Sequence, residues 1–268
     1  MSLAPAPVLL DVSPDGVAVL ELNRPAKRNA IDEAMIAGLG EALETLKGAD
    51  HIRIVFLRGA GGVFCAGADV EWMRRQGERS AHDNEADALA LARVLKALHA
   101  LPQFTVALVQ GAAMGGGAGL VAACDWAVAE KGAAFRFSEV RLGLTPATIS
   151  PYVIEAVGAR QARALFASAA PFDAARACAL GLVSELAEGD GGLQSAMKRL
   201  AGLALENAPG AVADAKKLVQ DFAGHPIDER IARETAKRIA ERRASGEGQE
   251  GAAAFIERRR PAWDRGQV

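Results

Sequence analysis

The strongest constraint on the fold is an alternation of strand-like and helix-like segments in the N-terminal half of the chain. Residues 17–22, 52–58 and 104–110 are short runs rich in β-branched residues, bounded by polar residues, glycine or proline, as buried strands are. Between them, residues 32–47 and 86–101 place their large apolar side chains on one helical face. This order predicts an α/β fold in which helices cover a largely parallel sheet.

The pattern changes after Pro146. Two more strand-like runs, residues 126–130 and 134–137, precede that point. The rest of the chain is predicted to form successive helices, which are interrupted at Gly158, at Pro171, at residues 188–192 and at residues 207–210. Residues 227–263 are rich in charge, which indicates a solvated helical face or a surface that contacts another subunit or a phosphorylated ligand.

The composition excludes several classes of function. With 268 residues, 50% of them hydrophobic and 24% charged, the chain can bury one large core. A formal charge of −2 gives no general attraction to nucleic acid or to an anionic membrane. No apolar run approaches the ~20 residues of a membrane helix, and the start of the chain lacks the pattern of a secretion signal. Three widely spaced cysteines are typical of free thiols in a reducing compartment, so we expect a cytoplasmic protein.

Several catalytic motifs are absent from the sequence. Four histidines are scattered without metal-ligand spacing, no GxSxG occurs, and the glycine cluster is not followed by the lysine of a P-loop. A metal site is therefore not expected. Residues 117–122 match GxGxxA after a strand and before a helix, but this match to a dinucleotide site is weak and lies far from the first strand.

Two segments each join a strand to a helix through small residues: GVFCAGADVEWM (residues 62–73), where Asp69 can begin the helix, and MGGGAG (residues 114–119). The free N–H groups at such helix starts favour negative charge. Two of them converging on one oxygen would form an oxyanion hole, in which each donor typically lowers the barrier by ~2.7–4 kcal/mol. The alternative is that both segments are tight turns that only allow close packing.

One carboxylate stands out near these segments. Glu139 lies between Phe137 and Val140 at the end of a strand-like run, in apolar surroundings that raise a carboxyl pKa toward the range of a general acid or base. Arg136 and Arg141 would oppose that shift if they came close. The alternative is an ordinary surface or capping glutamate.

With these motifs the chain resembles the enoyl-CoA hydratase/isomerase, or crotonase, superfamily. Four motifs occur in the family's order: LNRPAKRNAID (22–32), VFCAGADV (63–70), VQGAAMGGGAGLVAACD (109–125) and FSEVRLGLTP (137–146). The resemblance implies a spiral of ββα turns over residues 1–200 and a helical region over residues 201–268 that assembles a trimer or a dimer of trimers. It also implies an acyl-CoA thioester as substrate, with coenzyme A as part of that substrate rather than a separate cofactor, and it displaces the dinucleotide interpretation.

The family's site residues transfer to this sequence position by position. The resemblance places the two oxyanion N–H groups at Ala68 and Gly116 and a catalytic carboxylate at Glu139. It places the coenzyme A moiety along two short segments and near two further residues: Ala26, Lys27 and Arg28; Ala66, Asp69 and Val70; Gly115; and Arg141.

The chain departs from the family at Gly119. Classical hydratases of the family use two glutamates, and the first of them falls on Gly119, which cannot transfer a proton. We therefore expect a hydratase in which Glu139 is the sole general acid and base. The alternatives are a Δ3,Δ2-enoyl-CoA isomerase, an inactive acyl-CoA-binding homologue, or a replacement carboxylate from Asp69, Glu71 or Glu78.

A narrower resemblance concerns the acyl group. Residues 137–160 resemble the bacterial hydratases that act on methylglutaconyl-CoA and related branched, carboxylated enoyl-CoAs. A distal carboxylate would favour an arginine partner, which Arg141 or Arg136 can supply.

Overall fold

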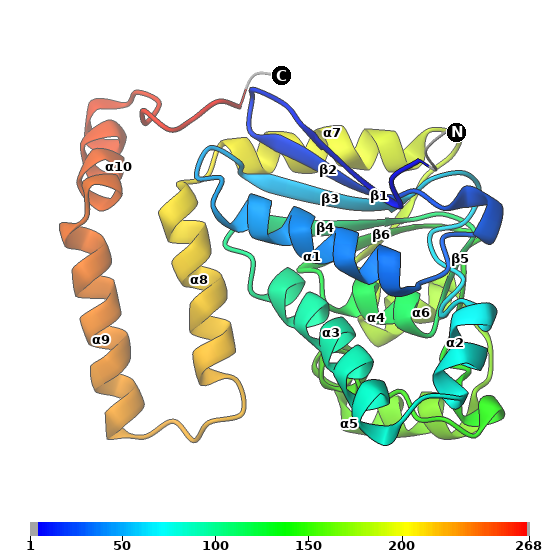
Figure 1. The fold of residues 1–268 in the computed structure, drawn as a ribbon. Helices are drawn as coiled ribbons and strands as arrows, with labels where there is room; N and C mark the ends of the chain where they lie inside the picture. Colours follow the sequence, from blue (N-terminus) through cyan, green and yellow to red (C-terminus); the bar gives the residue numbers. More distant parts are fainter. Residues whose placement is uncertain (1–4, 267–268) are drawn as a thin grey trace.

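The computed structural model describes residues 5–266, and its centre is a six-stranded sheet (Figure 1). The strands run in the order β1-β2-β3-β4-β6-β9. Only β1 is antiparallel to its neighbour, and the other pairs are parallel. Their bounds are Val8–Val12, Val17–Leu22, Ile54–Gly59, Phe104–Val109, Trp126–Glu130 and Glu185–Ala187. The predicted α/β class with a largely parallel sheet is confirmed.

A second, smaller sheet contains three strands, β5 (Ala112–Met114), β7 (Ala134–Arg136) and β8 (Phe172–Asp173). β5 and β7 are parallel, and β7 and β8 are antiparallel. The chain passes from a strand of the large sheet to a strand of the small sheet and then to a helix, first as β4-β5-α4 and again as β6-β7-α5. These repeated ββα turns place the carboxyl ends of β5 and β7 side by side.

The two faces of the large sheet are covered by different helices (Figure 1). Because side chains alternate along a strand, Leu20, Leu57 and Ala107 join one core, whereas Phe56 and Val128 join the other. The first core is covered by α1 (Glu33–Lys47), α3 (Ala81–His99), α4 (Gly116–Ala122), α5 (Ser150–Ser168) and α6 (Ala174–Leu180). The second core is covered by α7 (Gly192–Leu205).

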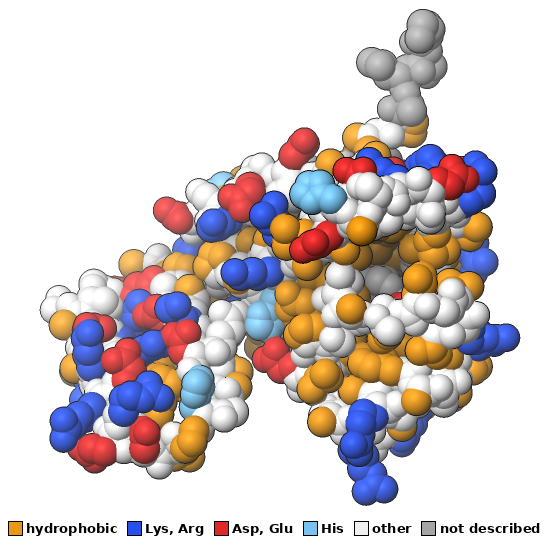
Figure 2. All heavy atoms as spheres, turned by 60° about the horizontal axis from the view of Figure 1, so that its bottom comes forward, with side chains coloured by type: hydrophobic (Ala, Val, Ile, Leu, Met, Phe, Trp, Pro, Cys, Tyr) orange, Lys and Arg blue, Asp and Glu red, His pale blue; other side chains and the backbone are white. Residues whose placement is uncertain are grey.

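A helical extension follows α7 and projects from the body of the molecule (Figure 1). It consists of α8 (Pro209–Phe222), α9 (Glu229–Ala244) and α10 (Gly246–Glu257). The division expected after residue 200 falls inside α7, whose apolar face covers the sheet, so the extension begins at α8. Figure 2 shows basic and acidic side chains interspersed on this projecting lobe and apolar ones gathered on the body.

The charged side chains of the extension pair with one another. Arg238 of α9 forms an ion pair with Asp221 of α8 at 2.7 Å, and Arg242 pairs with Asp214 and Glu247. The pairs with Asp221 and Asp214 join α9 to α8, and the pair with Glu247 joins α9 to α10. No helix among residues 5–266 combines the length and the apolar character needed to cross a bilayer.

Some elements differ from the sequence-based predictions. The strands β1, β5, β8 and β9 were not predicted, and the expectation of helices alone after Pro146 is wrong because β8 and β9 lie there. Strands of two or three residues are too short to show a period of two. Gly158, at φ +76°, interrupts the helical backbone as expected and divides α5 into two helical parts.

Candidate functional site

The segment around Cys65 pairs with β5, the strand that leads into α4. Cys65 forms an isolated parallel bridge with Ala113, its N–H donates to the Ala112 carbonyl at 3.0 Å, and its carbonyl accepts from Met114 N at 2.9 Å. Gly67, at φ +92°, follows this bridge, and a Cβ there would lie 3.1 Å from the Met114 carbonyl oxygen. The segment that contains Cys65 and the strand β5 therefore run parallel to each other, the first toward Ala68 and the second toward Gly116.

The side chain of Ile31 connects these two positions. Ile31 is bridged to Ala68 through two hydrogen bonds, from its own N–H to the Gly67 carbonyl and from Asp69 N–H to its carbonyl, each 2.8 Å long. Its Cδ1 lies 3.0 Å from the point where a Cβ on Gly116 would be. Among residues 5–266, the N–H groups of Ala68 and Gly116 donate to no oxygen. The two residues expected to supply the oxyanion donors therefore both adjoin Ile31.

Glu139 reaches the same place from the small sheet. Met114 at the end of β5 is in register with Arg136 at the end of β7, and Gly115 N–H donates to the Arg136 carbonyl at 2.8 Å. Gly115 adopts φ +48°, and a Cβ there would lie 2.9 Å from Oε1 of Glu139. The carboxylate therefore lies against Gly115, the residue that precedes Gly116. A side chain at position 115 would displace it.

The surroundings of Glu139 favour its neutral form. Burial of the carboxyl group raises its pKa, and this effect outweighs a hydrogen bond to its own backbone that lowers the pKa. Its Oε2 is buried and has no hydrogen-bond partner among the described residues. A raised pKa and an unpaired oxygen are properties of a group that accepts and returns a proton. Glu139 begins the 3-10 helix η2 (Glu139–Leu142), three residues beyond the end of β7, rather than ending a strand as expected.

Gly119 faces the core of the protein. A Cβ on Gly119 would lie 2.7 Å from Cβ of Ile149 and closer still to its Cγ2, and Ile149 is only 2% exposed. The space into which a side chain at position 119 would extend is therefore filled by an apolar side chain. Ile149 had no recognisable signal in the sequence, because it lies 30 residues from Gly119 in an irregular segment just before α5.

The other acidic candidates are engaged elsewhere. Asp69 is buried, accepts hydrogen bonds from the backbone N–H groups of Glu71 and Trp72, and thereby begins α2 (Val70–Gly77). Burial is the largest single influence on the pKa of Asp69 and raises it, but these hydrogen bonds and the ion pair with Arg24 together outweigh burial, so the pKa is lowered. Glu71 is exposed and pairs with Lys27, and Glu78 is exposed at the end of α2.

The segments expected to bind coenzyme A lie next to each other. Ala66 N–H donates to the Arg28 carbonyl at 3.0 Å, and Lys27 Nζ lies 3.2 Å from Glu71 Oε2. The residues from Ala26 to Arg28 are exposed, and Val70 is 74% exposed. Asp69 is placed differently from the rest, because its carboxylate is occupied within the protein.

Two residues missed by the sequence reasoning hold these segments in place. Arg24 donates to the Ala30 carbonyl and pairs with both Asp32 and Asp69, at 2.8 and 3.1 Å. Asn29 is fully buried at φ +55°, and its Nδ2 donates to the carbonyl groups of residues 60 and 63 at 2.9 and 2.7 Å. An asparagine with a positive φ bonded to a distant loop leaves no periodic signal in a sequence.

The two arginines considered for a distal carboxylate are placed differently. Arg141 is exposed on η2 and Arg136 is half-buried at the end of β7. The Nε of Arg136 donates to the Ala169 carbonyl at 2.7 Å, so part of its guanidinium group is already used inside the protein.

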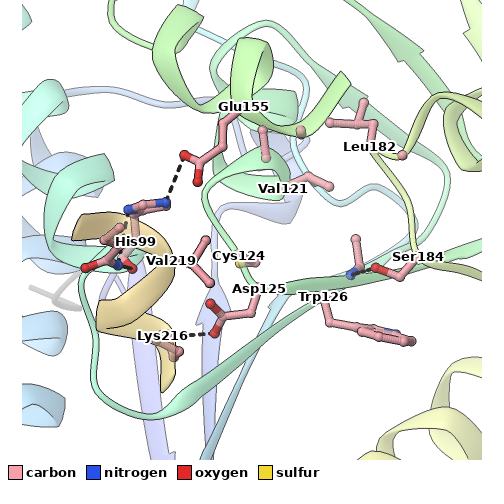
Figure 3. A pocket seen from close by; sticks show the side chains of 15 residues that line it. His99, Val121, Cys124, Asp125, Trp126, Glu155, Leu182, Ser184, Lys216 and Val219 are labelled. Carbon is pink, nitrogen blue, oxygen red and sulfur yellow. Dashed lines mark hydrogen bonds and ion pairs between the residues drawn. The ribbon is translucent and has the colours of Figure 1, made fainter. Parts of the chain in front are cut away.

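The other end of α4 borders a cavity of about 280 Å³ that Figure 3 shows from close by. Its charged side chains are paired: Lys216 Nζ lies 2.6 Å from Asp125 Oδ2, and His99 Nε2 lies 3.2 Å from Glu155 Oε2. Asp125 also accepts from the N–H and the hydroxyl group of Thr105, at 2.8 Å each. The pair of Lys216 with Asp125 fastens α8 to the body.

The three cysteines are free thiols, and burial raises the pKa of Cys65 to about 12. Among the side chains of residues 5–266, no three His, Cys, Asp or Glu residues are grouped closely enough to hold a metal ion.

Comparison with known proteins identifies the family to which this chain belongs. Residues 13–266 match the family described as enoyl-CoA hydratase/isomerase. A Thermus thermophilus protein assigned as an enoyl-CoA hydratase is 35% identical over 94% of this chain and 99% of its own length. The crystal structure of an enoyl-CoA hydratase from Shewanella pealeana superposes with a TM-score of 0.92 at 40% identity, covering 96% of each chain. Pseudomonas aeruginosa AtuE superposes with a TM-score of 0.92 at 35% identity, covering 97% of this chain and all of its own.

Proposed function

The chain belongs to the enoyl-CoA hydratase/isomerase family of enzymes, and from this membership we propose that it adds water to the 2,3-double bond of an enoyl-CoA thioester, with Glu139 as the only general acid and base. The observation that carries this proposal is the position of the Glu139 carboxylate against Gly115, the residue that precedes Gly116. The crotonase-like spiral core expected from the sequence agrees with the solved structures that superpose on this chain.

The proposed reaction uses the two parts of the site together. The thioester oxygen accepts hydrogen bonds from the N–H groups of Ala68 and Gly116. The Glu139 carboxylate takes a proton from water as the water oxygen bonds to C3, and the electrons of the double bond move onto the thioester as an enolate. Glu139 then returns the proton to C2 and is again a carboxylate. The reaction consumes one water molecule and needs no other reactant.

The coenzyme A moiety is proposed to lie along the segment from Ala26 to Arg28 and the segment from Ala66 to Val70. Their adjacency and exposure support this placement, and Lys27 and Arg28 supply local positive charge for phosphate groups. The carboxylate of Asp69 does not face this surface. It pairs with Arg24, which helps to hold the two segments in place.

The first test is the substitution Glu139→Gln. It preserves the size of the side chain and removes its ability to accept a proton, so kcat for hydration should fall by about 10²–10⁴-fold. Affinity for a saturated acyl-CoA, measured by calorimetry, should change little. An active Glu139→Gln enzyme would contradict the assignment of Glu139. A wild-type enzyme that turns over no enoyl-CoA would favour the inactive acyl-CoA-binding alternative.

A second candidate activity is Δ3,Δ2-enoyl-CoA isomerisation. The observation that favours it is the apolar contact between Gly119 and Ile149, which leaves no second carboxylate to hold a water molecule. Isomerisation moves one proton between carbons and needs only one carboxylate. Reactions in ¹⁸O-labelled water separate the two: hydration places the label in the product, whereas isomerisation moves the double bond without it.

The helical extension is proposed to assemble the chain into a trimer or a dimer of trimers. Large apolar side chains on it are unusually exposed: Ile227 at 95%, Phe255 at 86% and Ile256 at 78%. Sedimentation should give about three or six times the mass of one chain. A monomer at micromolar concentration would contradict the proposed assembly without affecting the proposed chemistry.

A further inference from the structure

The guanidinium group of Arg24 bonds oxygen atoms from three residues. Its Nη1 donates to the carbonyl group of Ala30, and its Nη2 lies 2.8 Å from Oδ2 of Asp32 and 3.1 Å from Oδ2 of Asp69. The side chain of Arg24 is 19% exposed. Arginine suits this position because its planar group stays charged and presents five donors in a fixed arrangement.

Both carboxylates that contact Arg24 also begin helices. Oδ1 of Asp32 accepts from Met35 N at 2.9 Å at the start of α1. Oδ1 of Asp69 accepts from Glu71 N at 2.9 Å at the start of α2. In each residue one oxygen caps the helix, and the other lies against the same nitrogen of Arg24. Because two neighbouring carboxylates would repel each other without a shared cation, Arg24 fixes the starts of α1 and α2 relative to each other.

Ile31 lies between Ala30 and Asp32, the two residues of its segment that the arginine holds. The N–H of Ile31 donates to the Gly67 carbonyl at 2.8 Å. That carbonyl and the N–H of Ala68 belong to one planar trans peptide group, so they point in opposite directions. The hydrogen bond from Ile31 therefore sets the direction of the N–H of Ala68.

The peptide group on the other side of Ala68 is fixed in the same way. The N–H of Asp69 donates to the Ile31 carbonyl at 2.8 Å, while the side chain of Asp69 pairs with Arg24. The peptide groups before and after Ala68 are thus both bonded to Ile31. Arg24 in turn holds both chain neighbours of Ile31 and the residue that follows Ala68.

We propose that Arg24 is a positioning residue, which through these three bonds keeps the N–H of Ala68 directed at the thioester oxygen. The inference rests on the proposed function, since that function assigns the N–H of Ala68 to this oxygen. A hydrogen bond to the oxygen strengthens as negative charge develops on it, so a misdirected N–H weakens the transition state more than it weakens substrate binding. Loss of Arg24 therefore lowers kcat and changes affinity little.

Two other roles for Arg24 have different signatures. The segment from Ala26 to Arg28, along which coenzyme A is proposed to lie, begins two residues after Arg24, so a phosphate group is the alternative partner of the guanidinium. Loss of that contact would weaken the binding of free coenzyme A. A purely structural role would lower the melting temperature and leave the direction of the Ala68 N–H unchanged.

The first experiment compares the kinetics of Arg24→Met, Asp69→Asn and the control Arg75→Met. Asparagine begins a helix as well as aspartate does, so Asp69→Asn removes the ion pair and keeps the start of α2. Arg75 joins the same two helices through an exposed ion pair with Glu33 at 3.1 Å. We expect kcat for hydration to fall about 10–10²-fold in Arg24→Met, by a smaller factor in Asp69→Asn and not at all in Arg75→Met, with KM changed less than about threefold.

The second experiment measures the hydrogen bond to the thioester oxygen. Hexanoyl-CoA labelled with ¹³C at its carbonyl has no double bond to hydrate, and its infrared carbonyl frequency falls when the oxygen accepts a hydrogen bond. Binding to the wild type should lower this frequency. The shift should be smaller in Arg24→Met and Asp69→Asn and unchanged in Arg75→Met, in proteins whose melting temperatures confirm folding. Calorimetry with free coenzyme A should give the same affinity in all four proteins.

Each contrary result has its own meaning. A full infrared shift in Arg24→Met would overturn the inference and leave Arg24 with a role in stability alone. Weaker binding of free coenzyme A by this variant would overturn it in favour of a direct phosphate contact. A wild type that hydrates enoyl-CoA without an infrared shift would overturn the inference, while the proposed hydration stands. A wild type that shows the shift and its dependence on Arg24, but hydrates no enoyl-CoA, would overturn only the proposed function.

Discussion

The two ends of α4 differ in whether the polar groups around them have hydrogen-bond partners. At the N-terminal end, the N–H of Gly116 and Oε2 of Glu139 have no partner within residues 5–266. At the C-terminal end, Asp125 is bonded to both Thr105 and Lys216, and the nearby His99 is paired with Glu155 (Figure 3). The unpaired end is suited to receive a ligand, and the paired end fastens α8 to the body.

The contrast shows why a cavity alone is a poor guide to function. The cavity at the paired end is lined by charged side chains that satisfy one another, although Nε1 of Trp126, which also lines it, is buried without a partner among the described residues. The N-terminal end has fewer charged groups, yet its donors and its carboxylate are free. Unpaired buried polar groups are costly to a fold, so they persist mainly where function needs them.

The largest expected effect comes from the middle of α4, which separates the two ends. Gly119→Glu would force a carboxylate into Ile149, so we expect the free energy of unfolding to fall by about 3–5 kcal/mol through overpacking and burial of a charge. Urea denaturation measures this loss. The double variant with Ile149→Ala should recover part of it. A Gly119→Glu protein as stable as the wild type, with a second carboxylate in its pH–rate profile, would show that Gly119 faces the substrate.

The next effect concerns the unpaired end. Gly116 is the first residue of α4, where proline is tolerated because its missing N–H has no helical partner. Gly116→Pro removes the donor, and Gly116→Ala keeps it while adding a Cβ against the flexible Cδ1 of Ile31. We expect kcat to fall by about 10²–10³-fold in the proline variant and much less in the alanine variant. Equal losses in the two variants would mean that the N–H of Gly116 does not act in catalysis.

A smaller effect is expected at the paired end. Lys216→Met removes the partner of Asp125 and of the Gln103 carbonyl, so thermal unfolding should show a loss of about 1–3 kcal/mol. The kcat of the remaining folded protein should equal that of the wild type. If Lys216→Met instead lowers kcat and leaves stability unchanged, the contrast between the two ends is wrong.

The smallest effect is a dependence of stability on pH. The folded state raises the pKa of Glu139, so the stability from its neutral form is fully present below the unfolded pKa near 4.5 and is lost as the pH rises through the folded pKa. Glu139→Gln should therefore be slightly more stable than the wild type at pH 8 and equal to it at pH 4. Melting temperatures at both pH values measure this difference. A variant that is less stable than the wild type at pH 8 would contradict the raised pKa.

The sequence predicted the elements whose apolar residues recur at regular intervals, and it predicted some of the residues at which helices begin. The strand at Val17–Leu22 has the predicted bounds, and Asp69 begins a helix as expected. Such signals are local, because a buried strand or a helix cap is written in neighbouring residues. The short strands β5, β8 and β9 were missed because tertiary pairing, rather than their own composition, makes them extended.

The sequence by itself determined the α/β class, the family resemblance and the identity of Glu139 as the notable carboxylate. Only the tertiary structure decided that Glu139 lies against Gly115, that Ile149 fills the space at Gly119, and that Arg24 joins Asp32 to Asp69. Each of these facts joins residues through space or depends on what lies around them. Side-chain packing and hydrogen-bond pairing between distant segments leave no periodic pattern in a chain, so the fold must be known before they can be seen.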